Sequence, residues 1–351
     1  MQGETEATVI VVTYNSALHI GATLDALLED PSRPVEIIVV DNASTDATAQ
    51  VVSERPVQWH PLDTNSGFGV AVNAGVAIAS QATVAVINDD ITVTPGWLPP
   101  LVHALATPGV GAAMATIELA DKPGHFNTSG GAVSVSGLAW ITDLGVEVPT
   151  DEPGVVDVPF PSGAAFAVRR DTWNRLGGFR EDLFMYHEDT DLGWRLRMLG
   201  MRTVRVPGSV VRHHYEFGRH PAKMRLLERN RLRIVATNYR RSTLALLAPV
   251  LLMHEVGVVV VAIRDGWFGG KVRSWAARPF SRSARQRYRS VQATRQIGDA
   301  EILAERIHGV ASIAVAGMDV PRGARIVDSV TKGYVRIVLP LVRALDRRAT
   351  K

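Results

Sequence analysis

Short β-branched runs alternate with helical stretches over residues 1–90, and this alternation constrains the fold more than any other feature of the sequence. Strands are expected at Val9–Val12, Val35–Val40, Val57–His60 and Thr83–Ile87. Between the first two strands, apolar side chains in residues 20–28 fall on one face of a helix. Repeated strand–helix units predict an α/β fold, in which a mostly parallel sheet is covered by helices on both faces.

Polar residues follow three of these strands, at the edge where such sheets bind their ligands. They are Thr13, Tyr14 and Asn15 after the first strand, Asp41 after the second, and Asn88, Asp89 and Asp90 after the fourth. The Asp41 carboxylate can accept a hydrogen bond from the N3–H of uracil or thymine, although a turn residue is the simpler interpretation. Carboxylates such as Asp89 and Asp90 suit Mg²⁺ or Mn²⁺, which can bridge the two phosphates of a nucleotide sugar, but adjacent carboxylates are also common in turns.

Three carboxylates lie within four residues at the start of a predicted helix: Glu188, Asp189 and Asp191. Repulsion between such close charges raises the pKa of one of them, and a carboxylate of this kind can take a proton from an acceptor hydroxyl. The alternative is an acidic helix N-terminus that pairs with Arg195 and Arg197. The residues alone favour neither interpretation, so we expect one working carboxylate and two structural ones.

Two histidines, His213 and His214, follow a strand-like segment at residues 203–211. A neutral imidazole can ligate a metal ion, although a pair of histidines is more often structural.

Composition excludes several functional classes. The chain has no cysteine, which rules out thiolate catalysis and cysteine-ligated zinc. The first strand is not followed by the G-x-G-x-x-G sequence that a dinucleotide-dependent oxidoreductase needs. The N-terminus lacks the basic and apolar regions of a signal peptide.

Charge divides the chain into two predicted domains, residues 1–218 and 219–351. The first has 12 basic and 26 acidic residues, 12 − 26 = −14, and the second has 26 and 9, 26 − 9 = +17. Within the basic domain, residues 243–263 are apolar except for a few positions that include His254 and Glu255. Basic and aromatic residues, Arg278 and Phe280 among them, then alternate up to residue 289.

This basic, mainly helical region predicts either an interfacial anchor on an anionic membrane or a buried helix at a homodimer interface. The length of the apolar segment also leaves a membrane-spanning helix open. No recognised nucleic-acid-binding module is present, so nucleic-acid binding is not expected.

Six segments in this order resemble family 2 glycosyltransferases with a GT-A fold, and bacterial rhamnosyltransferase-like enzymes among them. The segments are VIVVTYNS at 9–16, IIVVDNASTD at 37–46, NSGFGVAVNAG at 65–75, INDD at 87–90, PSGAAFAVRRDTWNRLGGFRE at 161–181 and FMYHEDTDLGWRLRMLG at 184–200. The resemblance implies inverting transfer of a sugar, with rhamnose from dTDP-rhamnose favoured, to a glycan or polyprenyl-linked hydroxyl in cell-envelope polysaccharide synthesis. The basic and aromatic residues after position 243, rather than this resemblance, predict a cytoplasmic protein that is peripheral on the inner face of the plasma membrane.

The resemblance further implies roles for individual residues. The nucleotide sugar would contact Thr13, Tyr14, Asn15, Asp41, Asn65, Gly67, Phe68, Asn88 and Asp89, and the acceptor would lie near Gly163, Ala164 and Ala165. Asp189 would be the catalytic base, with Glu188 beside it, and Asp90 and His213 would bind Mg²⁺ or Mn²⁺.

One residue departs from the family pattern. Asn88 replaces a carboxylate at the first position of the DxD-type motif, and an amide oxygen is a weaker metal ligand. A catalytically weak, sugar-nucleotide-binding scaffold at the membrane is therefore the alternative function.

Overall fold

The computed structural model describes residues 4–152, 154–214, 221–277, 281–305 and 322–349. The chain forms two compact units. The N-terminal unit comprises Met1–Gly131, Ile141–Leu196 and Met201–Glu216, and the C-terminal unit comprises Ala132–Trp140, Arg197–Gly200 and Phe217–Lys351. The predicted boundary at residues 218 and 219 lies outside the described residues, as do Arg278 and Phe280, so this boundary stays a prediction.

A ten-stranded sheet forms the centre of the N-terminal unit, in the order β10-β12-β6-β11-β4-β1-β2-β3, with β5 paired to β12 and β7 to β6. Its strands are β1 (Thr5–Thr13), β2 (Pro34–Asp41), β3 (Gln58–Pro61), β4 (Thr83–Asn88), β5 (Ile91–Val93), β6 (Val110–Leu119), β7 (Phe126–Thr128), β10 (Val156–Val158), β11 (Ala165–Arg169) and β12 (Arg202–His213). Strands β3, β2, β1 and β4 are parallel, whereas β11 runs antiparallel between β4 and β6. The predicted α/β class with a mostly parallel central sheet is confirmed.

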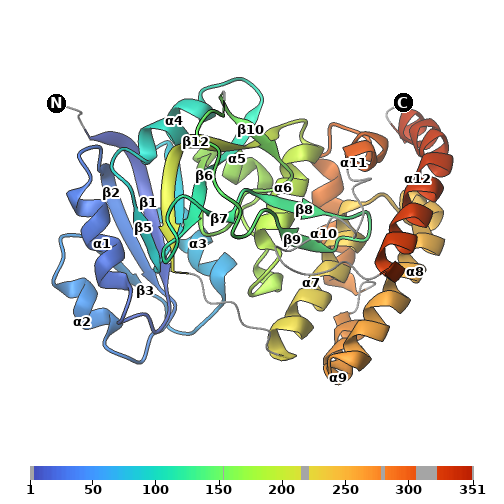
Figure 1. Cartoon of the computed structure of the whole chain (residues 1–351), viewed down its shortest axis with the longest axis horizontal. Coiled ribbons are helices and arrows are strands. Elements are labelled where there is room, and N and C mark those ends of the chain that lie inside the picture. Colours follow the sequence, from blue (N-terminus) through green and yellow to red (C-terminus); the bar gives the residue numbers. More distant parts are fainter. Residues whose placement is uncertain (1–3, 153, 215–220, 278–280, 306–321, 350–351) are drawn as a thin grey trace. The chain divides into compact units, whose positions relative to one another are not determined.

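Helices of the N-terminal unit connect the strands and pack on the sheet (Figure 1). They are α1 (Ile20–Glu29), α2 (Thr48–Ser53), α3 (Phe68–Ile78), α4 (Leu98–Leu105), α5 (Arg170–Leu176), the 3₁₀ helix η1 (Glu181–Leu183) and α6 (Glu188–Met198). Helix α3 packs on β1 and β2, and α4 packs on β6, β11 and β12. The central strands are buried, which is why their sequences are nearly continuous apolar runs rather than alternating ones.

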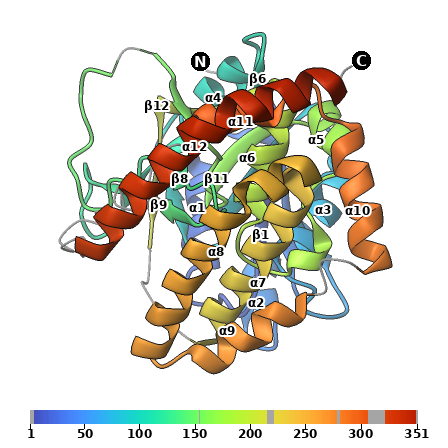
Figure 2. The same cartoon turned by 90° about the vertical axis from the view of Figure 1, so that its right-hand side faces the viewer.

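The C-terminal unit is mainly helical, as predicted. Its elements are α7 (Pro221–Asn238), α8 (Arg241–Arg264), α9 (Phe268–Ser274), η2 (Trp275–Ala277), α10 (Arg282–Ala293), α11 (Asp299–Glu305) and α12 (Arg322–Ala349). The strands β8 (Gly131–Val133) and β9 (Ala139–Ile141) form a separate two-stranded sheet. Helices α8 and α12 lie side by side in Figures 1 and 2, and the Tyr334 hydroxyl donates a hydrogen bond to the carbonyl of Leu246.

The two polar residues in the middle of α8 face partners inside this unit. His254 lies 2.8 Å from both Ser136 Oγ and Thr331 Oγ1. Burial and the charge of Arg231 lower the pKa of His254 to about 4, so the imidazole is neutral at physiological pH. Glu255 accepts hydrogen bonds from Lys271, Arg231 and Trp275. Burial alone would raise the pKa of Glu255, but these bonds outweigh that effect and lower it to about 2.

Candidate active site

The loops after β1 and β2 are tied together at the carboxyl edge of the sheet. Thr13 and Asp41 are paired in register at the strand ends, and the buried Asp41 carboxylate accepts hydrogen bonds from the backbone N–H and hydroxyl of Ser44. Asn15, whose φ is 52°, donates its N–H to Ser44 Oγ, and its side chain accepts from the N–H of Thr45. The Asp41 carboxylate therefore stabilises a turn here, which is the simpler of its two predicted roles.

The loop after β4 lies against the loop after β1. The N–H of Tyr14 is 3.3 Å from Asp89 Oδ2, and the Thr23 hydroxyl donates to the carbonyl of Asp89. Burial and the neighbouring Asp90 raise the pKa of Asp89, although hydrogen bonds from Thr13 and Ser16 act in the opposite direction. Four of the predicted nucleotide-sugar residues (Thr13, Tyr14, Asn15 and Asp89) thus share one edge of the sheet.

Asp90 and His213 meet because β5 pairs with the far end of β12. His213 is opposite Ile91 in this antiparallel pair, so its imidazole lies beside Asp90. Nε2 of His213 is 3.2 Å from Asp90 Oδ1, and Nδ1 is 3.0 Å from the side-chain oxygen of Asn127. A hydrogen bond at Nδ1 orients the ring and directs Nε2 toward Asp90.

These residues fit a divalent cation that is bound mainly by its substrate. Asp90 Oδ1 is buried and lies beside Nε2 of His213, so one carboxylate oxygen and one imidazole nitrogen stand next to each other as possible ligands. Within the described ranges there is no cluster of three or more His, Asp or Glu side chains that could hold a metal ion. Mg²⁺ is commonly bound by one or two protein groups plus substrate phosphates and water, so the pair Asp90 and His213 is sufficient.

The three clustered carboxylates have different environments. Asp191 is fully buried and pairs with Arg195 at 2.7 Å and with Arg180 at 3.7 Å. Arg195 also donates hydrogen bonds to the carbonyls of Leu176 and Gly178. A carboxylate fixed in this way holds α6 to the preceding loop and has a structural role.

Asp189 and Glu188 form a pair with raised pKa values. Asp189 Oδ1 accepts a 2.6 Å hydrogen bond from the N–H of Thr190, and Oδ2 lies 3.4 Å from the N–H of Gly163. Glu188 is buried and its Oε2 has no hydrogen-bond partner among the described residues. Burial and the charge of Asp189 raise the pKa of Glu188 to about 8, and burial also raises the pKa of Asp189. Ionisation of one carboxyl therefore opposes ionisation of the other, and the two groups titrate as a pair.

The predicted acceptor loop lies between this pair and the end of β4. Ala164 accepts a hydrogen bond from the N–H of Asn88 through its carbonyl, because β11 pairs antiparallel with β4 and starts beside the end of that strand. A side chain at Gly163 would lie 3.6 Å from the Phe68 ring and 3.9 Å from Asp189. The structure thus brings Phe68, Asn88, Gly163 and Asp189 together.

Two features of this site were not predicted from the sequence. The backbone before α6 has positive φ at Phe184, Tyr186 and His187, a conformation that costs non-glycine residues energy and often marks functional loops. Gly67, with φ of 91°, touches this segment, since a side chain at Gly67 would lie 2.1 Å from the Phe184 carbonyl oxygen. Asn127, which orients His213, carries no sequence signal of its own.

Substitution of Glu188 by Gln should stabilise the protein, increasingly so at higher pH. Because the folded-state pKa of Glu188 is raised from 4.5 to about 8, its contribution to stability is full below about pH 4.5 and is lost as pH rises through 8. Each pKa unit corresponds to about 1.4 kcal/mol, so the variant should gain up to a few kcal/mol above pH 8. Unfolding curves at several pH values for wild type, Glu188→Gln and the exposed control Glu181→Gln measure this. Equal gains at pH 5 and pH 9 would contradict it.

The fold, a mostly parallel sheet flanked by helices, is of the GT-A glycosyltransferase type. The fold is similar to that of GalNAc-T7 with UDP, GalNAc and Mn²⁺, with a TM-score of 0.55 and 18% identity over 66% of this chain and 47% of that chain. It is also similar to S. aureus TarS 1–349 in complex with UDP, with a TM-score of 0.50 and 18% identity over 83% of this chain and 90% of that chain.

Residues 8–175 match the family described as glycosyl transferase family 2. Over 242 residues, which are 61% of this chain and 78% of the relative, the chain is 33% identical to N-acetylglucosaminyl-diphospho-decaprenol L-rhamnosyltransferase of Mycobacterium tuberculosis. It is 33% identical over 123 residues to the succinoglycan biosynthesis protein ExoO of Rhizobium meliloti, covering 34% and 35% of the two chains. The chain belongs to glycosyl transferase family 2.

Proposed function

We propose that the protein is an inverting glycosyltransferase that moves a sugar from a nucleoside-diphosphate donor to a hydroxyl of a polyprenyl-linked acceptor in cell-envelope polysaccharide synthesis. The observation that carries the proposal is the position of Asp189, beside Gly163 and close to the end of β4. Rhamnose from dTDP-rhamnose is the favoured donor, because the relative at 33% identity is named for L-rhamnosyl transfer to a decaprenol-linked sugar.

The proposed reaction is a single displacement. The ionised Asp189 takes the proton of the acceptor hydroxyl as its oxygen attacks the anomeric carbon. The bond from that carbon to the diphosphate oxygen breaks on the opposite side, the bonding electrons leave with the diphosphate, and the configuration inverts. In this proposal Glu188, whose pKa is raised by burial and by the charge of Asp189, carries a proton, and Asp189 is the ionised partner. Mg²⁺ or Mn²⁺ held by Asp90 and His213 would supply positive charge for the leaving diphosphate.

The donor is proposed to bind across the ends of β1, β2 and β4. Asp41, Asn65 and Gly67 lie in the loops of this edge, where Asn65 accepts a hydrogen bond from the N–H of Gly67. Main-chain turns of this type leave backbone groups directed at a ligand.

A thermal-shift panel tests the donor and the metal together. We expect one nucleotide sugar among dTDP-rhamnose, UDP-sugars and GDP-mannose to raise the melting temperature, more with Mn²⁺ than without, and NAD to have no effect. Ligand at about 100 times its Kd stabilises the folded state by about 2.7 kcal/mol. The Mn²⁺-dependent part should disappear in Asp90→Ala and remain in Asp63→Ala, an exposed aspartate. No shift with any nucleotide sugar would contradict the proposed donor site. A shift without sugar transfer would favour the sugar-nucleotide-binding scaffold, which the amide at Asn88 supports.

The C-terminal unit is proposed to attach peripherally to an anionic membrane. One helix in the described part of the chain, α8, is long and apolar enough to cross a membrane, judged by length and composition only. Leu252, Val256, Val260 and Ile263 are exposed along one side of α8, spaced three or four residues apart. Because His254 and Glu255 have partners within the unit, an interfacial position suits α8 better than a spanning one.

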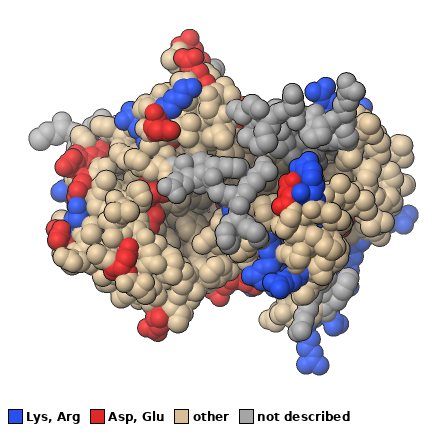
Figure 3. Space-filling model, turned by 60° about the horizontal axis from the view of Figure 1, so that its bottom comes forward, with Lys and Arg blue, Asp and Glu red and all other residues tan. Residues whose placement is uncertain are grey.

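Helix α12 adds a second exposed apolar stripe. Ile326, Val330, Ile337 and Leu341 are exposed on one side, and exposed arginines flank them at positions 325, 336 and 343. Blue side chains predominate over the C-terminal unit in Figure 3, whereas most of the red side chains lie on the N-terminal unit. Apolar stripes bordered by arginines suit an anionic lipid surface.

Flotation with vesicles tests the membrane proposal. The protein should float with phosphatidylglycerol-containing vesicles, less in high salt, and the double variant Val260→Asp/Ile337→Asp should lose most binding. The control Val146→Asp changes an exposed valine of the N-terminal unit and should bind normally. A stable dimer that does not bind vesicles, and that the double variant breaks, would show instead that these stripes form a subunit interface.

A further inference from the structure

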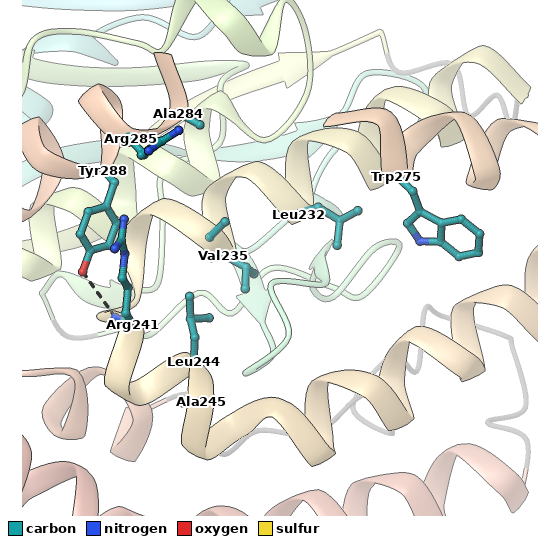
Figure 4. Close-up of a pocket in the computed structure, with 10 residues that line it drawn as sticks. Leu232, Val235, Arg241, Leu244, Ala245, Trp275, Ala284, Arg285 and Tyr288 are labelled. Atoms are coloured by element: carbon teal, nitrogen blue, oxygen red, sulfur yellow. Dashed lines mark hydrogen bonds between the residues drawn. The ribbon is translucent and has the colours of Figure 1, made fainter. Parts of the chain in front are cut away.

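A pocket of about 870 Å³ lies within the C-terminal unit, between α7, α8, η2 and α10. Leu232, Val235 and Leu244 line its middle, and Figure 4 shows Arg241, Arg285 and Tyr288 grouped at one end. The volume is in the range of small-ligand sites, about 300–1,000 Å³. An apolar middle with cationic side chains at one end suits a ligand with an apolar chain and an anionic head.

The cationic end is held in place by aromatic contacts. The Arg241 guanidinium lies over the Tyr288 ring, 5.1 Å from its centroid, and the backbone nitrogen of Arg241 is 3.4 Å from the Tyr288 hydroxyl oxygen. In the ranges that the structure describes, no carboxylate forms an ion pair with Arg241. A guanidinium stacked on an aromatic ring keeps its N–H groups available for phosphate oxygens.

The opposite end of the pocket is continuous with exposed apolar surface. Trp275, at this end in Figure 4, is 47% exposed, and its indole N–H is fixed by a 2.6 Å hydrogen bond to Glu255. Ala245 lines the pocket and is itself exposed on α8. Two apolar residues of the pocket, Trp275 and Ala245, thus also reach the protein surface, where the rest of a long apolar chain could leave the pocket.

We propose that this pocket binds the first isoprene units and the phosphate of the polyprenyl carrier, an inference that rests on the proposed lipid-linked acceptor. Arg241, with Arg285 beside it, contacts the phosphate, and Leu232, Val235 and Leu244 contact the prenyl chain. The pocket then holds the acceptor on the enzyme through its carrier, independently of the sugar that receives the new residue.

Calorimetric titration of the full chain with farnesyl diphosphate tests the pocket. We expect farnesyl diphosphate to bind. Inorganic pyrophosphate, which has only the anionic head, and farnesol, which has only the prenyl chain, should not bind comparably. Arg241→Gln and Ala245→Trp should each weaken it at least about tenfold. Their controls, Arg264→Gln and Ala248→Trp, change exposed residues of the same helix that do not line the pocket, and should bind as the wild type does.

Three results would overturn the pocket assignment: no binding of farnesyl diphosphate, equal losses in the control variants, or equally tight binding of lysophosphatidic acid, which would identify a phospholipid site. Failure of the proposed function has a different signature. In that case farnesyl diphosphate binds and the variants weaken it, but the wild type shows no nucleotide-sugar thermal shift and no transfer to a polyprenyl-linked acceptor.

Discussion

Asp189→Asn is expected to slow sugar transfer by about 10²–10⁴-fold, the usual contribution of a general base, while donor binding stays near normal. The amide cannot take the acceptor proton, but it preserves the shape of the side chain, and its one oxygen can still accept the hydrogen bond from the N–H of Thr190. The loss should therefore appear in kcat with little change in the KM for the donor.

Single-turnover transfer, together with the donor-induced thermal shift, measures this effect. Asp182→Asn, which changes a partly exposed carboxylate a few residues earlier, is the matched control. Near-normal turnover of Asp189→Asn would dismiss Asp189 as the base. A loss of donor-induced stabilisation equal to the loss of transfer would show instead that the carboxylate binds the donor.

Asp191→Ala is expected to destabilise the fold by about 3–5 kcal/mol, the usual cost of leaving a buried charge without its partner. Asp191 is fully buried, and its removal leaves the guanidinium of Arg195 in the interior without the carboxylate 2.7 Å away. Arg195 keeps its bonds to the two carbonyls, but its charge is then uncompensated.

Urea unfolding monitored by circular dichroism gives the free energy of unfolding for this comparison. The control Asp157→Ala breaks an exposed pair with Arg202 and should cost no more than about 1 kcal/mol. Similar unfolding free energies for wild type and Asp191→Ala would contradict the structural role. Asp189 and Asp191 are two residues apart, yet substitution of the first is expected to affect sugar transfer and substitution of the second to affect stability.

Local sequence patterns predicted most of the elements but not the contacts between distant ones. The runs at residues 9–12 and 83–87 lie in β1 and β4, and the predicted helix at 20–28 lies in α1. The sequence of residues 107–170 has many Gly and Pro and predicts only irregular strands and loops, yet this segment contains the ten-residue central strand β6. Its segment Gly111–Ala115 has low strand propensity, and burial between β11 and β12 decides its conformation.

For the candidate site, too, the sequence predicted the local features but not the contacts between distant residues. Strand ends could be located because polar residues interrupt apolar runs, but the closeness of Asp90 and His213 depends on the pairing of β5 with β12. The different environments of the three carboxylates depend on tertiary contacts. Asp191 pairs with Arg195, Asp189 lies beside the N–H of Gly163, and Glu188 Oε2 has no hydrogen-bond partner among the described residues. Period and spacing place all three on one helical turn and cannot distinguish them.

The hydrogen bond from Asn88 to the carbonyl of Ala164 constrains how such an enzyme can acquire new substrates. The backbone at Asn88, on the proposed donor side, is hydrogen-bonded to the backbone of the proposed acceptor loop, so a shift of one is expected to displace the other. A change in the backbone of residues 162–165 that alters the acceptor preference is therefore also expected to move the backbone that would hold the donor. New acceptor preferences are therefore expected to arise through side chains around this loop, or through the helices that follow residue 220, with the loop itself left in place.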